Sequence, residues 1–110
     1  ATIEGDAFVH GDARGGNFCL AGERAVWVDW SSAHIGHPDE DLSLLAVSIA
    51  ADGGPIVELS DNALALVALH SASWVTRAGQ KPPEWGPGVK EIEAHLWIGA
   101  KRLLTPYLTG

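Results

Sequence analysis

The fold is decided by Phe8-Val-His-Gly-Asp-Ala-Arg-Gly-Gly-Asn-Phe-Cys-Leu20 and by Val26-Trp-Val-Asp-Trp30. In the first stretch, four polar residues share eight positions with three glycines: His10, Asp12, Arg14 and Asn17. In the second, Asp29 follows an apolar run that is typical of a buried strand. Two acids and an amide on tight loops at strand ends can hold a divalent metal ion and a reacting hydroxyl group.

The apolar runs predict short strands on either side of these polar residues. A buried strand over residues 7–9 leads into the loop, and a second strand covers residues 17–20. A turn at Ala21-Gly-Glu-Arg24 then returns the chain through a strand that ends at Val28. Such a hairpin brings Asn17 and Asp29 to the same end of the ribbon, because both lie outside its paired arms.

In the remainder of the chain, the sequence pattern predicts a polar loop over residues 31–37 and then three helices. The first has Pro38 at its first helical position and acids in its first turn, and continues to about Ala51. The second is capped by Ser60 or Asp61 and stopped by Gly79, and the third runs over about 89–104. The expected fold class is therefore α+β, mostly helical.

Composition narrows the range of functions. A chain of 110 residues forms one small domain or part of a larger one. The net charge of -7 and the seven scattered basic residues argue against a nucleic-acid surface. Cys19 is the only cysteine, which excludes an intrachain disulfide, and its apolar neighbours favour a buried thiol. No apolar run is long enough for a membrane span, and we expect a cytoplasmic protein.

The spacing of the polar residues resembles a known enzyme family. The pattern His10-Gly-Asp-x-Arg-x-x-Asn17, followed eleven residues later by Val-Asp-Trp, is similar to the aminoglycoside phosphotransferase and choline kinase family. Ile35-Gly-His-Pro-x-x-Asp41-Leu extends the resemblance, which covers residues 7–47 well. Because this family is similar in fold to the protein kinases, the resemblance implies the C-terminal lobe of a protein-kinase-like fold.

The resemblance also implies a role for each of these residues. It makes the chain part of an ATP-dependent phosphotransferase that moves the γ-phosphate of ATP, with Mg²⁺, to a hydroxyl group of a small molecule. The implied roles are Asp12 and Arg14 as catalytic residues, Asn17 and Asp29 as metal ligands, Cys19 and Val28 as the apolar floor beneath the nucleotide, and His10 and Asp41 as supports of the loop. Many family members have His where this chain has Arg14.

The resemblance further implies that the nucleotide-binding N-terminal lobe precedes this sequence. We expect residues 1–110 to form one partial domain, with a hairpin region over 7–30 and a helical region over 38–110. The isolated chain is expected to bind nucleotide weakly and to turn over nothing measurable. Apolar surface left open without the missing lobe could also lead the fragment to associate with itself.

Two other functions are compatible with these residues. A non-catalytic relative would keep the fold as a binding or regulatory module, and a metal-dependent phosphoester hydrolase would use the same acids to activate water. The acceptor is not specified, since family substrates include aminoglycosides, choline and other hydroxylated molecules. Trp85 is a candidate for lining an acceptor pocket. His34 and His37 could ligate zinc, although no third ligand is suitably spaced.

Overall fold

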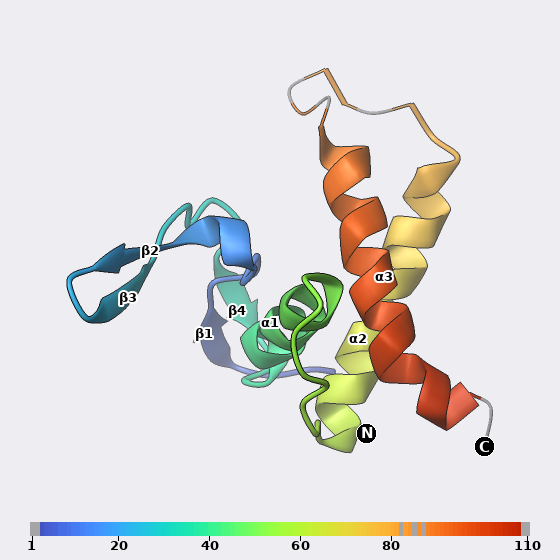
Figure 1. Ribbon diagram of the computed structural model, residues 1–110, viewed down its shortest axis with the longest axis horizontal. Coiled ribbons are helices and arrows are strands. Elements are labelled where there is room, and N and C mark those ends of the chain that lie inside the picture. The colour runs from blue at the N-terminus through green and yellow to red at the C-terminus, as the bar shows by residue number, and fades with distance from the viewer. Residues whose placement is uncertain (1–2, 82, 85, 87, 109–110) are drawn as a thin grey trace.

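The computed structural model describes residues 3–81, 83–84, 86 and 88–108. Within these residues, three helices and two small antiparallel sheets form a mostly helical α+β fold (Figure 1). The elements in chain order are β1 Ala7–Val9, a 3-10 turn Gly15–Asn17, β2 Phe18–Ala21, β3 Arg24–Trp27, β4 His34–Gly36, α1 Glu40–Ala51, α2 Asp61–Ala78 and α3 Val89–Leu108. The predicted fold class is confirmed at this level.

The predicted hairpin is present, with β2 paired to β3 so that Phe18 faces Trp27 and Ala21 faces Arg24. The prediction that the return strand is buried is wrong. The hairpin projects away from the helices (Figure 1), and Val26 and Val28 are exposed. Among the described residues, only its inner face meets another element, because Phe18 and Trp27 line a small hollow together with Leu45 of α1.

The loop predicted over residues 31–37 contains a strand instead. β4 pairs antiparallel with β1, and the pairs include Phe8 with Ile35 and Val9 with His34. The predicted buried strand over 7–9 is buried only at Val9, because Phe8 lies on the outside and stacks on Trp30 with ring centroids 6.0 Å apart. This small sheet lies between the hairpin and α1 (Figure 1).

The helix boundaries follow the capping side chains. Ser60 accepts a hydrogen bond from the Ala63 amide at 3.1 Å, so α2 begins where the sequence predicts. It ends at Ala78, before Gly79, also as the sequence predicts. Pro38 is not the first residue of α1, which begins at Glu40 because the His37 ring accepts the Asp39 amide at 3.0 Å and keeps that residue in a turn. α3 continues beyond the predicted end, with Pro106 inside it.

The core lies where the three helices meet. It contains Ala46, Val47 and Ala50 of α1 together with residues of the other two helices: Ala63, Val67, Trp74, Leu96, Ala100 and Leu103. Gly99 allows the close crossing of α1 and α3, because a Cβ there would run into the Val47 carbonyl oxygen and lie 2.7 Å from the Ala51 nitrogen. The small residues thus set the distance between these helices.

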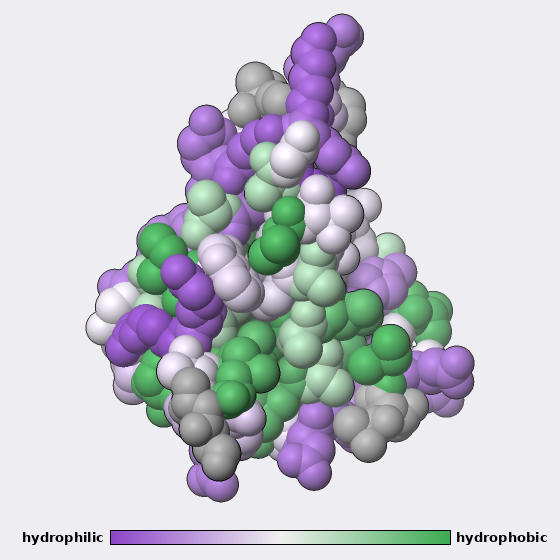
Figure 2. All heavy atoms as spheres, turned by 90° about the vertical axis from the view of Figure 1, so that its right-hand side faces the viewer, coloured by the Kyte–Doolittle hydropathy of each residue, from purple (hydrophilic) through white to green (hydrophobic). Residues whose placement is uncertain are grey.

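The outer side of the helical body is partly apolar. Figure 2 shows a hydrophobic area on the face that lies on the right-hand side of Figure 1. Exposed apolar side chains of α2 and α3 include Leu69, Val75 and Ile98. No helix in the described part of the chain has the length and apolar character to cross a membrane.

Candidate functional site

Residues 10–17 form a loop (loop 10–17) between β1 and β2, and one carboxylate holds its beginning. Asp41, in the first turn of α1, accepts hydrogen bonds from the His10 amide at 2.8 Å and from the Gly11 amide at 3.0 Å. Gly11 has a left-handed backbone (φ +86°), and a Cβ there would collide with the Ser32 carbonyl oxygen. The start of the loop is therefore fixed both to α1 and to the segment before β4.

The His10 side chain joins this loop to the end of the hairpin. Its Nδ1 accepts the Asp12 amide at 3.2 Å, and its Nε2 lies 2.8 Å from the Val28 carbonyl oxygen. Nδ1 accepts a hydrogen bond, so it carries no proton. The Val28 carbonyl oxygen can only accept, so Nε2 must donate to it, and the ring is neutral with its proton on Nε2. The ring is buried, with its centroid 5.4 Å from that of Trp27 and 4.7 Å from that of Trp30. His10 thus occupies a supporting position.

Asp12, Arg14 and Asn17 come together in the second half of the loop. The Asn17 amide nitrogen donates to the Asp12 carbonyl oxygen at 2.9 Å and to Asp12 Oδ2 at 2.8 Å. Arg14 Nε donates to Asp12 Oδ1 at 3.1 Å. Both oxygens of the Asp12 carboxylate are therefore held, while 36% of its side-chain surface stays exposed. Since the buried Asn17 uses its nitrogen on these two acceptors, its amide orientation is fixed.

A buried serine that the sequence analysis did not single out anchors the turn of this loop. Ser48 of α1 accepts the Gly15 amide with its Oγ at 2.9 Å. A serine in the middle of a helix more often bonds to its own helix or to water, so its position alone does not reveal this contact. α1 therefore holds both ends of loop 10–17, through Asp41 and through Ser48.

Asp29 follows the residue that is bonded to Asn17, as the predicted hairpin requires. The Val28 amide donates to the Asn17 carbonyl oxygen at 2.7 Å, one step beyond the last strand pair. Asp29 has a left-handed backbone (φ 56°), a conformation that Asp tolerates better than most residues and that is common at functional sites. The Ser31 hydroxyl donates to its Oδ1 at 2.7 Å, and this bond lowers the pKa of Asp29. Its carboxylate is therefore charged at neutral pH.

The residues around loop 10–17 offer few metal ligands. In the described ranges, no three His, Cys, Asp or Glu side chains are arranged to hold a metal ion. The oxygen donors available at this end of the hairpin are those of Asn17 and Asp29, and hard oxygen ligands of this kind fit Mg²⁺. Mg²⁺ commonly takes only one or two protein ligands and completes its shell with water and phosphate oxygens. Asn17 and Asp29 therefore fit an ion of this kind, but they do not form a site in which protein groups supply all the ligands.

Cys19 and Val28 share one face of the hairpin. Neighbouring residues of a strand point to opposite faces, and residues paired across two strands point to the same face. Cys19 therefore shares a face with its partner Val26 and with Val28, which lies two residues further along the strand and opposite Asn17. Phe18 and Trp27 occupy the other side, toward α1. The prediction of a buried thiol is wrong: Cys19 is exposed, as are Val26 and Val28 on the same face. The face is apolar and open.

A hollow of about 300 Å³ lies beside the loop. Residues 14–16 form one wall, and α1 and α3 supply Ser48, Asp52, Glu91 and His95. His95 Nε2 lies 2.6 Å from Asp52 Oδ1. The hollow is therefore lined by Arg14, the ion-pair partner of Asp12, and carries acidic side chains.

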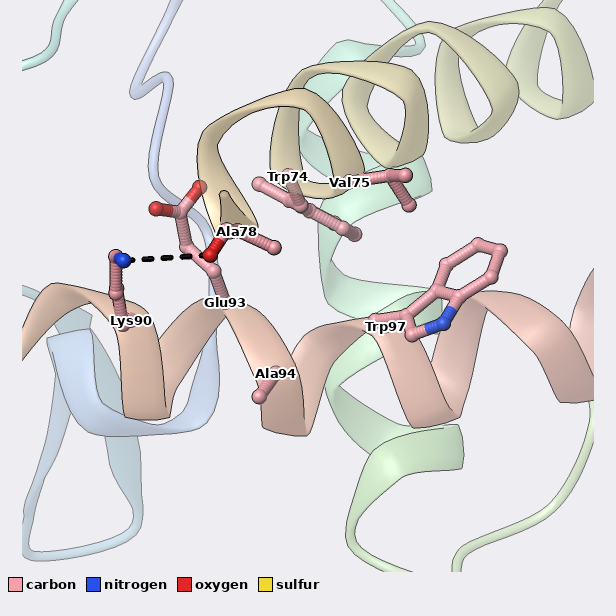
Figure 3. Close-up of a pocket in the computed structure, with 7 residues that line it drawn as sticks. All are labelled: Trp74, Val75, Ala78, Lys90, Glu93, Ala94 and Trp97. Carbon is pink, nitrogen blue, oxygen red and sulfur yellow. Dashed lines mark hydrogen bonds between the residues drawn. The ribbon is translucent and has the colours of Figure 1, made fainter. Parts of the chain in front are cut away.

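A second hollow, of about 390 Å³, lies between α2 and α3 (Figure 3). Trp74 and Val75 of α2 and Trp97 of α3 make it apolar, and Lys90 donates to the Ala78 carbonyl oxygen at 3.2 Å. It contains no residue of loop 10–17. The hollow beside the loop is therefore the better candidate for a site that works with Asp12.

The two histidines considered as zinc ligands have other partners. The ring of His34 contacts Glu40 and Ser32, whereas the ring of His37 accepts the Asp39 amide. Trp85 lies outside the described residues.

Comparison with known proteins gives one result. Residues 5–74, more than half of the chain, match a family model described as the phosphotransferase enzyme family. The match includes loop 10–17, both small sheets, α1 and most of α2. Neither a curated protein nor a solved structure matches the chain.

Proposed function

Because this chain belongs to the phosphotransferase enzyme family, we propose that it is the catalytic-lobe portion of an ATP-dependent enzyme that transfers the γ-phosphate to a hydroxyl group of a small molecule. The observation that supports the proposal is that Asn17 holds the Asp12 carboxylate and is bonded through its own carbonyl to Val28, the residue before Asp29. A protein-kinase-like lobe is part of the same proposal.

Asp12 orients the acceptor hydroxyl and accepts its proton in this proposal. The Asn17 amide and the Arg14 guanidinium hold its two oxygens in a fixed orientation, and the carboxylate remains partly open to a ligand. Phosphoryl transfer depends on such positioning and on neutralising the phosphate charge. Arg14, which is half-buried beside Asp12, is placed to approach a transferring phosphoryl group.

Asn17 and Asp29 would hold Mg²⁺ together with the nucleotide. The fixed amide of Asn17 and the charged carboxylate of Asp29 support this assignment. When bound, Mg²⁺ neutralises charge on the phosphates as the transfer proceeds. The open face with Cys19 and Val28 begins next to these two residues, and we propose that it lies under the adenine ring.

The acceptor would occupy the hollow beside loop 10–17. This hollow is lined by Arg14, whose Nε contacts Asp12, and in this proposal the acceptor hydroxyl would extend from the hollow toward the Asp12 carboxylate. Asp52 and Glu91 on its walls would favour a hydroxylated acceptor that also carries positive charge. The chain's net charge of -7 acts in the same direction.

A paramagnetic binding experiment tests the metal and nucleotide site. Mn²⁺ in place of Mg²⁺, added with ATP to the chain, is expected to broaden the amide resonances of Asn17 and Asp29 before others. In Asp29→Ala this broadening should be lost, because a charged ligand is removed. Glu23→Ala is the matched control, since Glu23 is an exposed acid in the hairpin turn at the opposite end of the ribbon.

Two results would contradict the proposed site: broadening that begins elsewhere, or broadening that persists in Asp29→Ala. With the site established, transfer of labelled γ-phosphate to a panel of amino alcohols tests the reaction. Release of phosphate without any acceptor would instead indicate a hydrolase. Binding of Mn²⁺ and ATP without transfer or release would favour a non-catalytic module.

A further inference from the structure

Glu40 forms a cluster with two histidines from different elements (the Glu40 cluster: Glu40, His34 and His70). Glu40 is the first residue of α1, His34 lies on β4 and His70 lies on α2. Glu40 Oε2 is 2.7 Å from His34 Nε2, and Glu40 Oε1 is 3.6 Å from His70 Nε2. Only 12% of the Glu40 side chain is exposed. The carboxylate is thus enclosed between the rings of two bases.

One oxygen of the enclosed carboxylate depends on His34. Among the described residues, Glu40 Oε2 and His70 Nε2 are buried without a well-aligned hydrogen bond, and the close partner of Glu40 Oε2 is His34 Nε2 at 2.7 Å. A carboxylate oxygen removed from water is costly unless a cation lies beside it. The nearest available positive charge is a proton on His34.

The position of the His34 ring requires that proton. Its Nδ1 lies 2.8 Å from the Ser32 carbonyl oxygen, which can only accept, so this nitrogen carries a hydrogen. Its Nε2 faces the Glu40 carboxylate, and that contact is attractive only when Nε2 is protonated as well. Both contacts are satisfied together only by the doubly protonated imidazolium. A neutral ring must give up one of them.

The same ring lies directly against loop 10–17. A Cβ added to Gly11 would stand 3.0 Å from His34 Nδ1, so the ring and the loop backbone are in contact. On its other side, a Cβ on Gly36 would stand 3.0 Å from His34 Nε2 and 3.1 Å from Glu40 Oε2. Asp41, which follows Glu40, accepts the Gly11 amide. A movement of His34 therefore reaches Gly11 through the ring itself, and a movement of Glu40 reaches Gly11 through the neighbouring Asp41.

We propose that the Glu40 cluster is a proton-sensitive joint, in which protonation of His34 holds Gly11 and the start of loop 10–17 against α1 and its deprotonation loosens them. The joint lies outside the Asp12, Asn17 and Asp29 group. The proposal concerns the position of the loop and does not depend on whether the chain transfers phosphate.

The charged groups around the joint determine where it titrates. The Ser32 carbonyl raises the pKa of His34 above its ordinary value of 6.5, with further help from Glu40 and Asp41 of α1 and against partial burial. Burial lowers the pKa of His70 below 6.5, opposed by Glu40 and assisted by His34 and by Arg77 of α2. Glu4 and His37 line a surface hollow together with His34 and Glu40. His34 therefore changes charge above pH 6.5, where His70 is already mostly neutral.

The sign of the effect on stability follows from these directions. A raised pKa in the folded state means that the contribution of His34 is complete below 6.5 and is lost as the pH rises through its folded pKa. A lowered pKa means that the contribution of His70 is present above 6.5 and is lost as the pH falls toward its folded pKa. Together the two histidines favour the folded state most near pH 6.5.

An NMR titration of the unmodified chain over about pH 5 to 9 tests the joint. The His34 ring is expected to titrate above 6.5, and the Gly11 amide should shift with the same midpoint. In Glu40→Gln the midpoint of His34 should fall, because the facing negative charge is gone. In His34→Gln the Gly11 amide should lose this pH dependence. His95→Gln is the matched control, since the His95 ring faces Asp52 and not Gly11.

The unmodified chain decides the question even if a variant does not fold. A Gly11 amide that stays constant while His34 titrates would overturn the proposal. So would a His34 midpoint at or below 6.5. A midpoint that is unchanged in folded Glu40→Gln would show that Glu40 is not part of the joint and would overturn it as well.

Discussion

Loop 10–17 and the β2–β3 hairpin carry the two halves of the candidate site, yet they are held in different ways. The loop is fixed by side chains of α1: Asp41 accepts two of its amides and Ser48 accepts a third. The hairpin projects from the body, and its face with Cys19 and Val28 is open (Figure 1). The difference indicates that loop 10–17 takes its position from polar contacts to a packed helix, whereas the hairpin is held mainly by its own strand pairing.

α1 can hold loop 10–17 only if α1 is itself fixed to the rest of the helical body. We therefore expect the largest loss in the free energy of unfolding from a change at the crossing of α1 and α3. In Gly99→Ala the new methyl group meets the backbone of Val47 and Ala51, which cannot move away as a flexible side chain could. Overpacking of this kind costs about 1–3 kcal/mol, occasionally more, and the gain in helix propensity of about 1 kcal/mol offsets only part of it. We expect a net loss of about 2 kcal/mol in the free energy of unfolding, measured with urea.

Gly79→Ala is the control for this change. Gly79 follows α2 with an ordinary backbone (φ −86°), and a Cβ there would meet nothing within 4 Å. Its stability should change by less than about 1 kcal/mol, in the stabilising direction. Equal losses in the two variants would show that the close crossing of α1 and α3 does not stabilise the body.

The same two regions show what could be predicted from sequence. The hairpin, the caps of α2 and the spacing of the loop residues are local features, because each depends on neighbours a few positions away. β4 was missed because His34-Ile-Gly36 is too short to show alternation, and its pairing with β1 joins segments far apart in the chain. The exposure of Val26 could not be foreseen, since an apolar strand has the same sequence whether or not another element covers it.

Two residues show this limit, Ser48 at the candidate site and Gly99 at the crossing of α1 and α3. Ser48 carries no sequence signal for its bond to Gly15, which depends on how α1 is rotated against the loop. Gly99 would be taken for a weak helix residue, whereas its lack of a side chain is what permits the crossing. Contacts between elements of this kind require coordinates. The roles of Asp12, Asn17 and Asp29 stay predictions until the binding experiments are done.

A smaller effect is expected when the anchor of the loop itself is removed. Asp41→Ala leaves the amides of His10 and Gly11 without their acceptor, and a hydrogen bond to a charged group contributes about 1.5–3 kcal/mol. The two bonds share one carboxylate, and water can take its place at both amides, so we expect a combined loss close to that of a single such bond, about 1.5 kcal/mol. Hydrogen exchange should accelerate at His10 and Gly11 more than at the hairpin amides.

Asp39→Ala is the control for the anchor. Asp39 is an acid at the same helix start, and its Oδ2 accepts the Ser60 hydroxyl at 3.0 Å and no loop amide. It should leave exchange at His10 and Gly11 unchanged. Similar acceleration in the two variants would mean that the helix start as a whole, and not the Asp41 carboxylate, holds the loop.

The smallest effect is expected on the hairpin, where the same substitution can be compared at an exposed and at a buried position. Val26→Thr replaces a methyl group by a hydroxyl on the open face, where 42% of the residue is exposed, and Thr is also a good strand former. We expect the free energy of unfolding to change by less than about 0.5 kcal/mol. A large loss in Val26→Thr would mean that in solution the hairpin face is covered, and the contrast between the held loop and the open hairpin would then fail. Val67→Thr makes the same change in the core at full burial, where burying a hydroxyl costs about 1–3 kcal/mol. Because Val67 lies in a helix, its new hydroxyl can donate to a carbonyl of the preceding turn, as Ser71 and Thr76 do, so the difference between the two variants reflects burial together with the change from strand to helix.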